Sequence, residues 1–274
     1  MPAPEALSAS SIQLYLTCSL KWRFQYLDRL PRLTTSVNQA FGIAMHAALN
    51  WLHKARKDRR NPPLAEVLQV FDADWYAQTQ TEGNLTVHFD DVSDATLLAH
   101  KGKELLTQYY HQPTGQVRDS EVWFTLPLVN PATGEVLDVP LRGAIDLIET
   151  DDVIVEFKSP QKAPPITALP DDIQVTTYAY AYEKLFGKLP REIRKISFVR
   201  TKVPRVDPPQ ITGRDHQDFE RLFHLGREVI KGVRAGVFLP SRGCWLCNDC
   251  EYDQDCREWT GNEEVMAGVQ AAGQ

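Results

Sequence analysis

Residues 141–158 read LRGAIDLIETDDVIVEFK, and this stretch has the strongest pattern of structure and charge in the chain. It predicts two strands joined by a tight acidic turn at residues 151–152, because the second strand is apolar and β-branched until Glu156. Residues two apart on a strand point to the same face, so Glu156 and Lys158 project together. Pairing across the turn brings Asp146 alongside them. The sequence therefore predicts two carboxylates and one ammonium group at the end of a buried hairpin.

Charged groups at the end of an apolar strand require compensation, because burying an unpaired charge is unfavourable. One interpretation is a divalent-metal site in which Asp146 and Glu156 supply the oxygen ligands that Mg²⁺ or Mn²⁺ prefers. Lys158 would then orient the attacking water or stabilise charge on a phosphate. The other interpretation is a structural ion pair between Glu156 and Lys158 at a solvated strand end. The short pattern Asp-x(9)-Glu-x-Lys leaves both open.

The order of Asp146, Glu156 and Lys158 resembles the core motif of the PD-(D/E)XK nuclease superfamily, and the surrounding chain resembles its RecB-like branch. The resemblance runs from about residue 8 to residue 259. Three further motifs carry it in the order of that branch: a histidine on an early helix (FGIAMH, 41–46), Gly-x-x-Asp on the central strand (GAID, 143–146) and Gln-x-x-x-Tyr after the lysine strand (QVTTY, 174–178).

The resemblance implies an α/β fold with a restriction-endonuclease-like core, in which helices flank a mixed sheet. His46 would contact the metal beside the two carboxylates, directly or through water. Gln174 would bond Lys158 or DNA. Tyr178 would touch DNA, although core packing explains this residue equally well. Glu121 resembles a glutamate that many relatives carry on the strand before the aspartate, in a supporting or a solvent-facing role.

The composition is that of an ordinary soluble globular protein, with 274 residues, 43% hydrophobic and 24% charged. No apolar run approaches the roughly 20 residues that a membrane span requires. The N-terminus also lacks the basic start and apolar stretch of a secretory signal, so we expect a cytoplasmic protein without membrane contact. The net charge of −6 argues mildly against a nucleic-acid binder, but only a local basic groove is needed.

We expect one nuclease domain over residues 1–274, with three regions. These are a helical N-terminal region (8–112), a catalytic α/β core (118–236) and a C-terminal cysteine segment (237–262). Hydrophobic periodicity and turn residues predict the elements. The predicted helices cover 8–27, 38–60, two segments within 64–112 on either side of the polar stretch 79–94, one from about 171, and 214–236. The predicted strands cover 121–128, 135–149, 153–158 and 193–203.

Four of the five cysteines, namely Cys244, Cys247, Cys250 and Cys256, lie close together near the C-terminus, and Cys18 is alone. Structural disulfides are not expected in a cytoplasmic chain. The Cys-x-x-Cys pair at 247 and 250, with Cys256 after it, offers three thiolates to one metal centre, which requires a fourth. From the spacing alone, the fourth is either Cys244 or Cys18.

The iron–sulfur RecB-like nucleases, including AddB-type and CRISPR-associated exonucleases, take one cysteine from an N-terminal helix and three from the C-terminus. The resemblance therefore implies a 4Fe–4S cluster on Cys18, Cys247, Cys250 and Cys256, which would join the two ends of the chain. Zinc on the same four thiolates is the alternative. Cys244 departs from the simplest pattern.

The implied activity is metal-dependent hydrolysis of DNA by an exonuclease that acts on single strands or DNA ends. Its setting would be repair, recombination, or phage- or CRISPR-related DNA processing. The chain has no Gly-x-x-x-x-Gly-Lys-(Ser/Thr) phosphate loop, so unwinding would come from a partner such as a helicase. The alternative is a non-catalytic iron–sulfur module that binds DNA ends within a larger repair complex. The sequence does not distinguish DNA from RNA.

Overall fold

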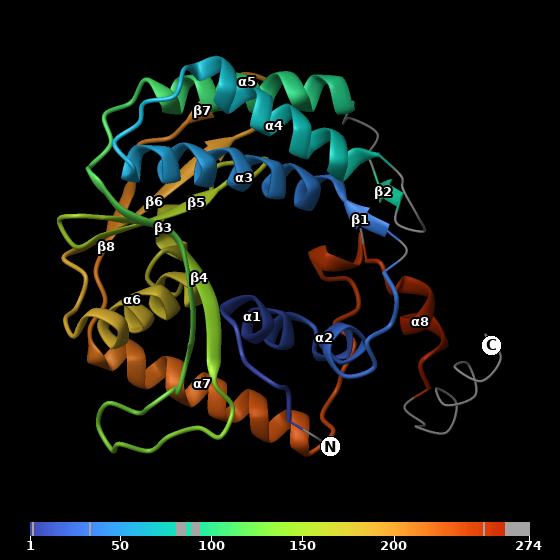
Figure 1. The fold of residues 1–274 in the computed structure, drawn as a ribbon. Coiled ribbons are helices and arrows are strands. Elements are labelled where there is room, and N and C mark those ends of the chain that lie inside the picture. Colours follow the sequence, from blue (N-terminus) through green and yellow to red (C-terminus); the bar gives the residue numbers. More distant parts are fainter. Residues whose placement is uncertain (2, 33, 81–85, 89–93, 249, 261–274) are drawn as a thin grey trace.

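A mixed six-stranded sheet forms the centre of the described part of the chain (Figure 1). The structure is a computed structural model, and it describes all residues except 2, 33, 81–85, 89–93, 249 and 261–274. The strand order is β3-β4-β5-β6-β7, with β8 also paired to β6. Strands β5 and β6 are parallel, and the other pairs are antiparallel. The strands are β3 (Val117–Leu126), β4 (Leu141–Glu149), β5 (Val153–Lys158), β6 (Glu192–Val199), β7 (Arg205–Val206) and β8 (Gln210–Thr212).

Helices cover both faces of this sheet (Figure 1). One face carries α3 (Val37–Lys57), α4 (Leu64–Thr79) and α5 (Ala95–Tyr110). The other carries α6 (Ile173–Phe186) and α7 (His216–Arg234); α1 (Ala9–Thr17) packs against these two helices, and α2 (Ser19–Tyr26) lies next to α1. Alternate residues of β5 enter opposite cores, since Val155 packs with α3 to α5 and Ile154 packs with α6 and α7.

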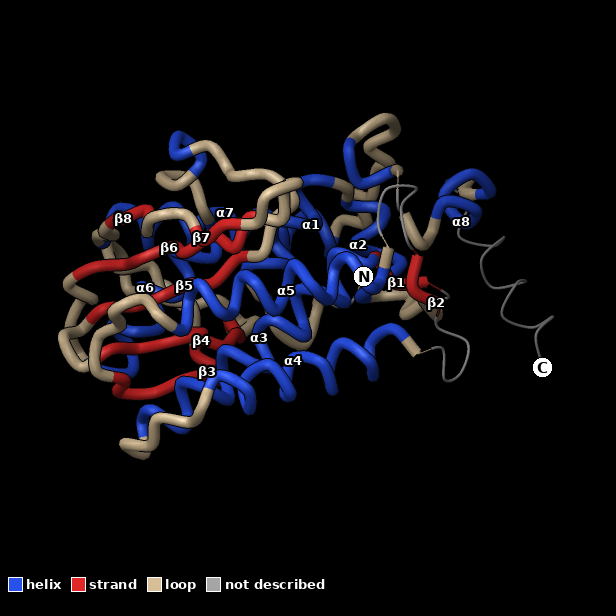
Figure 2. The backbone as a smooth tube through the Cα atoms, turned by 90° about the horizontal axis from the view of Figure 1, so that it is seen from above, coloured by secondary structure: helices blue, strands red, loops and turns tan. Residues whose placement is uncertain are grey.

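The smaller elements gather at the end of the molecule opposite β8 (Figure 2). They include β1 (Thr34–Ser36), β2 (Thr86–His88) and α8 (Asp253–Glu258). Two single-turn 3₁₀ helices, η1 (Ile166–Ala168) and η2 (Trp245–Cys247), lie in loops. Among the described residues, no helix combines the length and the apolar character needed to cross a membrane.

The prediction of an α/β fold with a mixed sheet between helices is confirmed. Strand β5 has the predicted bounds, Val153–Lys158. Its first five residues are buried, because β4 and β6 pair with it on both sides and helices cover both of its faces. The predicted helices around residues 64–112 are α4 and α5, and most of the polar stretch between them lies outside the described residues.

The single helix predicted over residues 8–27 is wrong, because the chain breaks at Cys18. Cys18 has an extended backbone (φ −154°, ψ 96°), so it ends α1 and begins α2. The C-terminal segment stabilises this break: the N–H of Leu20 donates to the carbonyl of Leu239 (3.2 Å), and the N–H of Leu239 donates to the hydroxyl of Ser19 (2.8 Å). Contacts with residues more than 200 positions away thus override the local helical periodicity.

Other elements also differ from the predictions; for example, β3 covers Val117–Leu126 instead of 121–128, and β6 ends at Val199 instead of 203. The predicted strand over 135–149 begins only at Leu141, directly after Pro140, which has no N–H to donate to a neighbouring strand. The N-terminal region is not purely helical, because β1 and β2 form a short parallel pair. Strands β7 and β8 are too short for a periodic signal and were not predicted. Residues 261–262 of the predicted cysteine segment lie outside the described residues.

We predict that Gly102→Ala destabilises the protein. Alanine normally favours a helix interior over glycine by about 1 kcal/mol. At Gly102, however, a Cβ atom would overlap the ring of Phe71, which is fully buried. Overpacking costs about 1–3 kcal/mol, and this overlap is severe, because the nearest ring atom would lie 2.2 Å from the new Cβ. The upper part of this range, less about 1 kcal/mol of helix propensity, predicts that the free energy of unfolding falls by about 1–2 kcal/mol in a urea titration. Gly213→Ala is the control, since its added Cβ would have no atom of the described residues within 4 Å apart from its chain neighbours. A Gly102→Ala protein as stable as the wild type would contradict the prediction.

Candidate active site

The candidate site lies where β4 and β5 separate. Their ladder ends at the pair Leu147 and Val155. Beyond this pair, a side chain takes the place of the backbone acceptor: Oδ2 of Asp146 accepts a hydrogen bond from the backbone N–H of Phe157 (2.9 Å). Its Oδ1 lies 3.5 Å from Nδ1 of His46, which α3 provides. Asp146 is therefore held between the central strand and a helix of the covering layer.

Glu156 is fully buried between the same elements, with 0% of its surface exposed. Neither carboxylate oxygen accepts a hydrogen bond of normal geometry from the described residues. Oε1 instead lies 2.5 Å from Nζ of Lys158, in an ion pair. Burial, and then the charge of Asp146, raise the pKa of Glu156 to about 8, against the opposing effect of Lys158. Glu156 is thus a carboxylate with too little positive charge around it.

The pKa of Asp146 moves in the opposite direction. Burial acts to raise it, but the contacts with His46 and the N–H of Phe157 outweigh burial and hold the pKa below its usual value. Burial likewise acts to lower the pKa of His46, and the Asp146 carboxylate outweighs this effect and raises it. Two neighbouring carboxyl groups with pKa values shifted apart are typical of sites that handle protons or bind cations.

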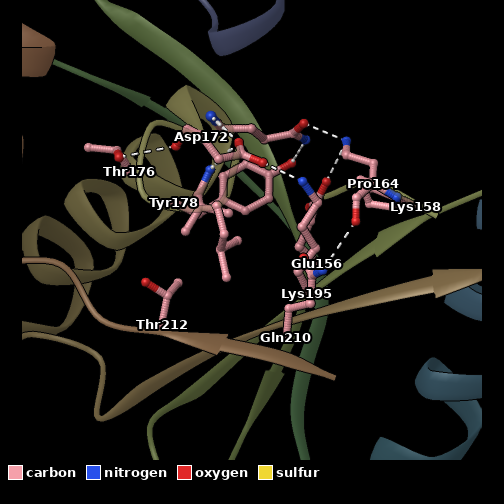
Figure 3. Close-up of polar contacts among 12 residues, drawn as sticks. Glu156, Lys158, Pro164, Asp172, Thr176, Tyr178, Lys195, Gln210 and Thr212 are labelled. Atoms are coloured by element: carbon pink, nitrogen blue, oxygen red, sulfur yellow. Dashed lines mark hydrogen bonds and ion pairs between the residues drawn. The ribbon is translucent and has the colours of Figure 1, made fainter. Parts of the chain in front are cut away.

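Lys158 connects the carboxylates to helix α6. Its ammonium group donates a hydrogen bond to Oε1 of Gln174 (2.5 Å), and Nε2 of Gln174 donates to the hydroxyl of Tyr178 (2.7 Å). Figure 3 shows this row of contacts between β5 and α6. Burial acts to lower the pKa of Lys158, but Glu156 outweighs it and raises the pKa, so the ammonium group stays charged.

The N-terminus of α6 is fixed to the sheet by Asp172. Its Oδ1 accepts hydrogen bonds from the N–H groups of Gln174 (3.0 Å) and Val175 (3.2 Å), as an N-cap residue does. Its Oδ2 lies 2.5 Å from Nζ of Lys195 on β6 (Figure 3). Gln174 is therefore aimed at Lys158 by a helix end that cannot rotate freely.

A cavity of about 740 Å³ opens onto these groups. Of the six residues predicted for the site, five line it: His46, Asp146, Lys158, Gln174 and Tyr178. Glu156 lies behind Lys158 and does not reach the surface of the cavity. Among the described residues, no group of three or more His, Cys, Asp or Glu side chains is arranged so that it could hold a metal ion. The structure therefore brings the predicted residues together without an assembled three-ligand set.

The cysteines also meet, at a second and much smaller cavity of about 30 Å³. All five line it, so Cys18 at the break between α1 and α2 lies among the C-terminal cysteines. Sγ of Cys244 and Sγ of Cys247 are 3.8 Å apart. Burial raises the pKa of Cys250 and of Cys256. Like the carboxylates, the described cysteines do not form a group arranged for a metal.

Sequence reasoning did not predict the role of Asn50, one turn beyond His46 on α3. Its Nδ2 donates to Glu121, and its Oδ1 accepts from the hydroxyl of Ser120 (3.0 Å), which also donates to the carbonyl of Asp146 (3.2 Å). Asn50 therefore joins α3 to β3 and β4 beside the carboxylates. Its spacing of four residues from His46 was the available signal, because residues four apart share a helix face.

Comparisons with known proteins identify the family. The sequence profile of the "PD-(D/E)XK nuclease superfamily" matches residues 6–257, so the chain belongs to this superfamily. None of the curated proteins matches the sequence. A crystal structure of a candidate exonuclease from Eubacterium rectale is similar in fold, with a TM-score of 0.52 and 14% identity over 90% of this chain and 88% of that chain. The structure of SSO0001 matches at 15% identity over 91% and 93% of the two chains, but its TM-score of 0.33 is too low to support an argument.

We predict that acid destabilises the core beneath the site through His53. This residue is fully buried, stacks on Phe157 (5.7 Å between ring centroids) and shares a hydrogen bond with the hydroxyl of Tyr109 (3.0 Å). Burial, and then Arg56, lower its pKa from 6.5 to about 3. Between these pH values His53 binds a proton in the unfolded chain but not in the folded protein. The contribution of neutral His53 to the stability is therefore complete above about pH 6.5 and is lost as the pH falls towards 3.

The test compares slopes of unfolding free energy against pH from 7 to 4.5. We expect His53→Gln to give a shallower fall than the wild type, whatever its stability at pH 7. His100→Gln, at an exposed histidine, should keep the wild-type slope. Equal slopes for wild type and His53→Gln would contradict the assignment.

Proposed function

We propose that this member of the PD-(D/E)XK nuclease superfamily is a metal-dependent enzyme that hydrolyses DNA phosphodiesters. One observation carries the proposal. Asp146 and the ion pair of Glu156 with Lys158 meet beside a cavity, and the two carboxyl groups have pKa values shifted in opposite directions. A purely structural ion pair would not require a second carboxylate at its side, because the extra negative charge is unfavourable in a buried place.

The chemistry of the residues fits a divalent cation. Both oxygens of Glu156 are buried without a hydrogen bond among the described residues, and Asp146 adds a second carboxylate. Hard oxygen ligands suit Mg²⁺ or Mn²⁺, and the imidazole of His46 suits Mn²⁺ better. We propose that His46, Asp146 and Glu156 hold this ion. When bound, it would lower the pKa of a water molecule and offset negative charge on the phosphoryl group.

The remaining predicted residues have complementary roles in this proposal. Lys158 carries the positive charge that stabilises the negative charge developing on the phosphate, and it orients the attacking water. Gln174 fixes the ammonium group by accepting its hydrogen bond, and Tyr178 in turn holds Gln174. Burial raises the pKa of Tyr178 far above neutral pH, so its hydroxyl stays protonated and can also donate to DNA.

We propose single-stranded DNA or DNA ends as the substrate and an exonuclease as the mode of action. The cavity of about 740 Å³ beside Asp146 and Lys158 supports this, since it offers a space that an unpaired strand or a chain end can enter. The setting would be DNA repair, recombination, or phage- or CRISPR-related processing. A helicase is the partner that such an enzyme would need to act on duplex DNA.

The alternative is a non-catalytic iron–sulfur module that binds DNA ends in a larger repair complex. The buried position of Glu156 favours this binding module. Glu156 lies behind Lys158 and does not line the cavity, so it would not contact a substrate there. The two functions make opposite predictions for cleavage.

We expect the purified protein to cut end-labelled DNA when Mn²⁺ or Mg²⁺ is present, and to stop when EDTA is added. Glu156→Ala removes a proposed ligand and the ion pair of Lys158, so the rate should fall by about 100-fold or more. Glu220→Gln, at a surface carboxylate on α7, should keep the wild-type rate. The pattern of labelled products on single-stranded and duplex DNA then gives the polarity of cutting.

Equal cutting by Glu156→Ala would mean that another site, or a contaminant, cleaves the DNA. Absence of cutting by a folded wild type that binds DNA would favour the binding module.

We further propose a 4Fe–4S cluster on Cys18, Cys247, Cys250 and Cys256, with zinc on the same thiolates as the alternative. The cavity that the cysteines line supports the proposal, because it joins the N-terminal break to the C-terminal segment. Cysteine thiolates suit both groups. The role would be structural, since the cluster would hold together the two ends of the chain.

We expect anaerobically purified wild type to contain iron and acid-labile sulfide. Cys18→Ser should lose both and unfold at a lower temperature, because a bond between the chain ends is lost. Cys244→Ser is the matched control and should keep the metal. Metal analysis that finds one zinc ion and no sulfide would replace the cluster by zinc, and a Cys18→Ser protein with full metal content would remove Cys18 from the ligand set.

A further inference from the structure

We propose that Trp123 and Arg142 form a guide for single-stranded DNA, in which the indole stacks on a base and the guanidinium binds a phosphate as the strand enters the site. The inference rests on the proposed nuclease function and specifies its substrate. Both residues line the cavity of about 740 Å³ that contains Asp146 and Lys158. Both also line an adjoining cavity of about 560 Å³.

Trp123 is the most exposed large apolar side chain among the described residues, with 73% of its surface accessible. It lies on β3, an edge strand of the sheet, directly opposite Ala144 on β4. The small alanine leaves the indole uncovered by its cross-strand neighbour. An exposed tryptophan that faces a site has no packing role in the monomer, so its flat surface is available to a ligand.

A distortion of β3 gives Trp123 this direction. Ser120 and Glu121 are consecutive, and side chains on a regular strand would point to opposite faces. Both nevertheless bond to Asn50 of α3, and Glu121 has a left-handed backbone (φ 55°), which is unfavourable for a non-glycine residue. The alternation is therefore reversed at Glu121, and Trp123 faces the cavity while its neighbour Phe124 enters the core.

Arg142 supplies positive charge on the same surface. Its guanidinium makes no ion pair or hydrogen bond with any described residue, unlike most arginines of the chain. Residues 142, 144 and 146 alternate along β4 and all three line the cavity. At about 3.3 Å per residue, Arg142 lies about 13 Å along the strand from Asp146. Trp123, across from Ala144, lies between them.

This arrangement selects a single strand over a duplex. An aromatic ring stacks on an unpaired base of any identity, whereas the bases of a duplex already stack on one another. A basic group near the stacked base binds the backbone without reading sequence. Arg142, Trp123 and Asp146 therefore form a row along which a flexible single strand can bind, with its phosphates leading towards Asp146.

The test measures binding of 5′-fluorescein-labelled oligothymidylate to the full chain in EDTA, so that cleavage does not interfere. We expect Trp123→Ala to weaken this binding by about ten-fold or more, and Trp123→Phe to recover most of it, because a ring remains. Arg142→Gln should lower the slope of log affinity against log salt by about 0.7, the value for one phosphate contact on a single strand. The affinity of Trp123→Ala for a blunt duplex should differ from that of the wild type by less than two-fold.

Tyr76→Ala is the matched control, because Tyr76 is 65% exposed on α4 and lies outside both cavities. It should bind as the wild type does. Oligothymidylate binding by Trp123→Ala within two-fold of the wild type, an equal loss on duplex, or no wild-type binding to oligothymidylate would each overturn the guide. If the wild type cleaves DNA but Trp123→Ala binds oligothymidylate normally, the proposed guide is wrong and the proposed nuclease activity stands. If the wild type never cleaves DNA but Trp123→Ala binds oligothymidylate more weakly, the proposed nuclease activity is wrong and the guide stands.

Discussion

The carboxylate of Glu156, which is buried and accepts no hydrogen bond from the described residues, is the constraint on which the site depends. An uncompensated charge in such a place is unfavourable by several kcal/mol. The ion pair with Lys158 offsets part of this, but Asp146 stands close enough to raise the pKa of Glu156. More positive charge is required at this point whenever Glu156 is ionised. A divalent cation would supply it, and members of the superfamily generally use Mg²⁺ or Mn²⁺.

The layers around the sheet maintain this arrangement from two sides. Below β5, the ion pair of Asp172 with Lys195 fixes the start of α6, and α6 aims Gln174 at Lys158. Above it, α3 brings His46 to Asp146. The parallel connection from β5 through α6 to β6 is therefore more than a core element, because it determines where the ammonium group lies. The cavity opens between these two supports.

Much of this could be predicted from sequence, because the signal is local. Strand β5 reads as one apolar run, and the spacing of Asp146, Glu156 and Lys158 follows from a hairpin. The break at Cys18 could not be predicted, since the bonds that stabilise it come from Leu239 and form only in the folded chain. The reversal of β3 at Glu121 similarly depends on α3. Local periodicity contains no information about either contact.

The most direct measurement is the melting temperature of metal-free protein at pH 8.5 as Mn²⁺ is added, for wild type and for Glu156→Gln. A ligand that binds only the folded state stabilises it by mass action. We expect the wild-type Tm to rise with Mn²⁺ concentration, and the Glu156→Gln protein, which lacks the buried charge, to begin from a higher Tm and respond little. An equal rise of the Tm in both proteins, or no rise in the wild type, would contradict the conclusion that the buried carboxylate of Glu156 binds a divalent cation.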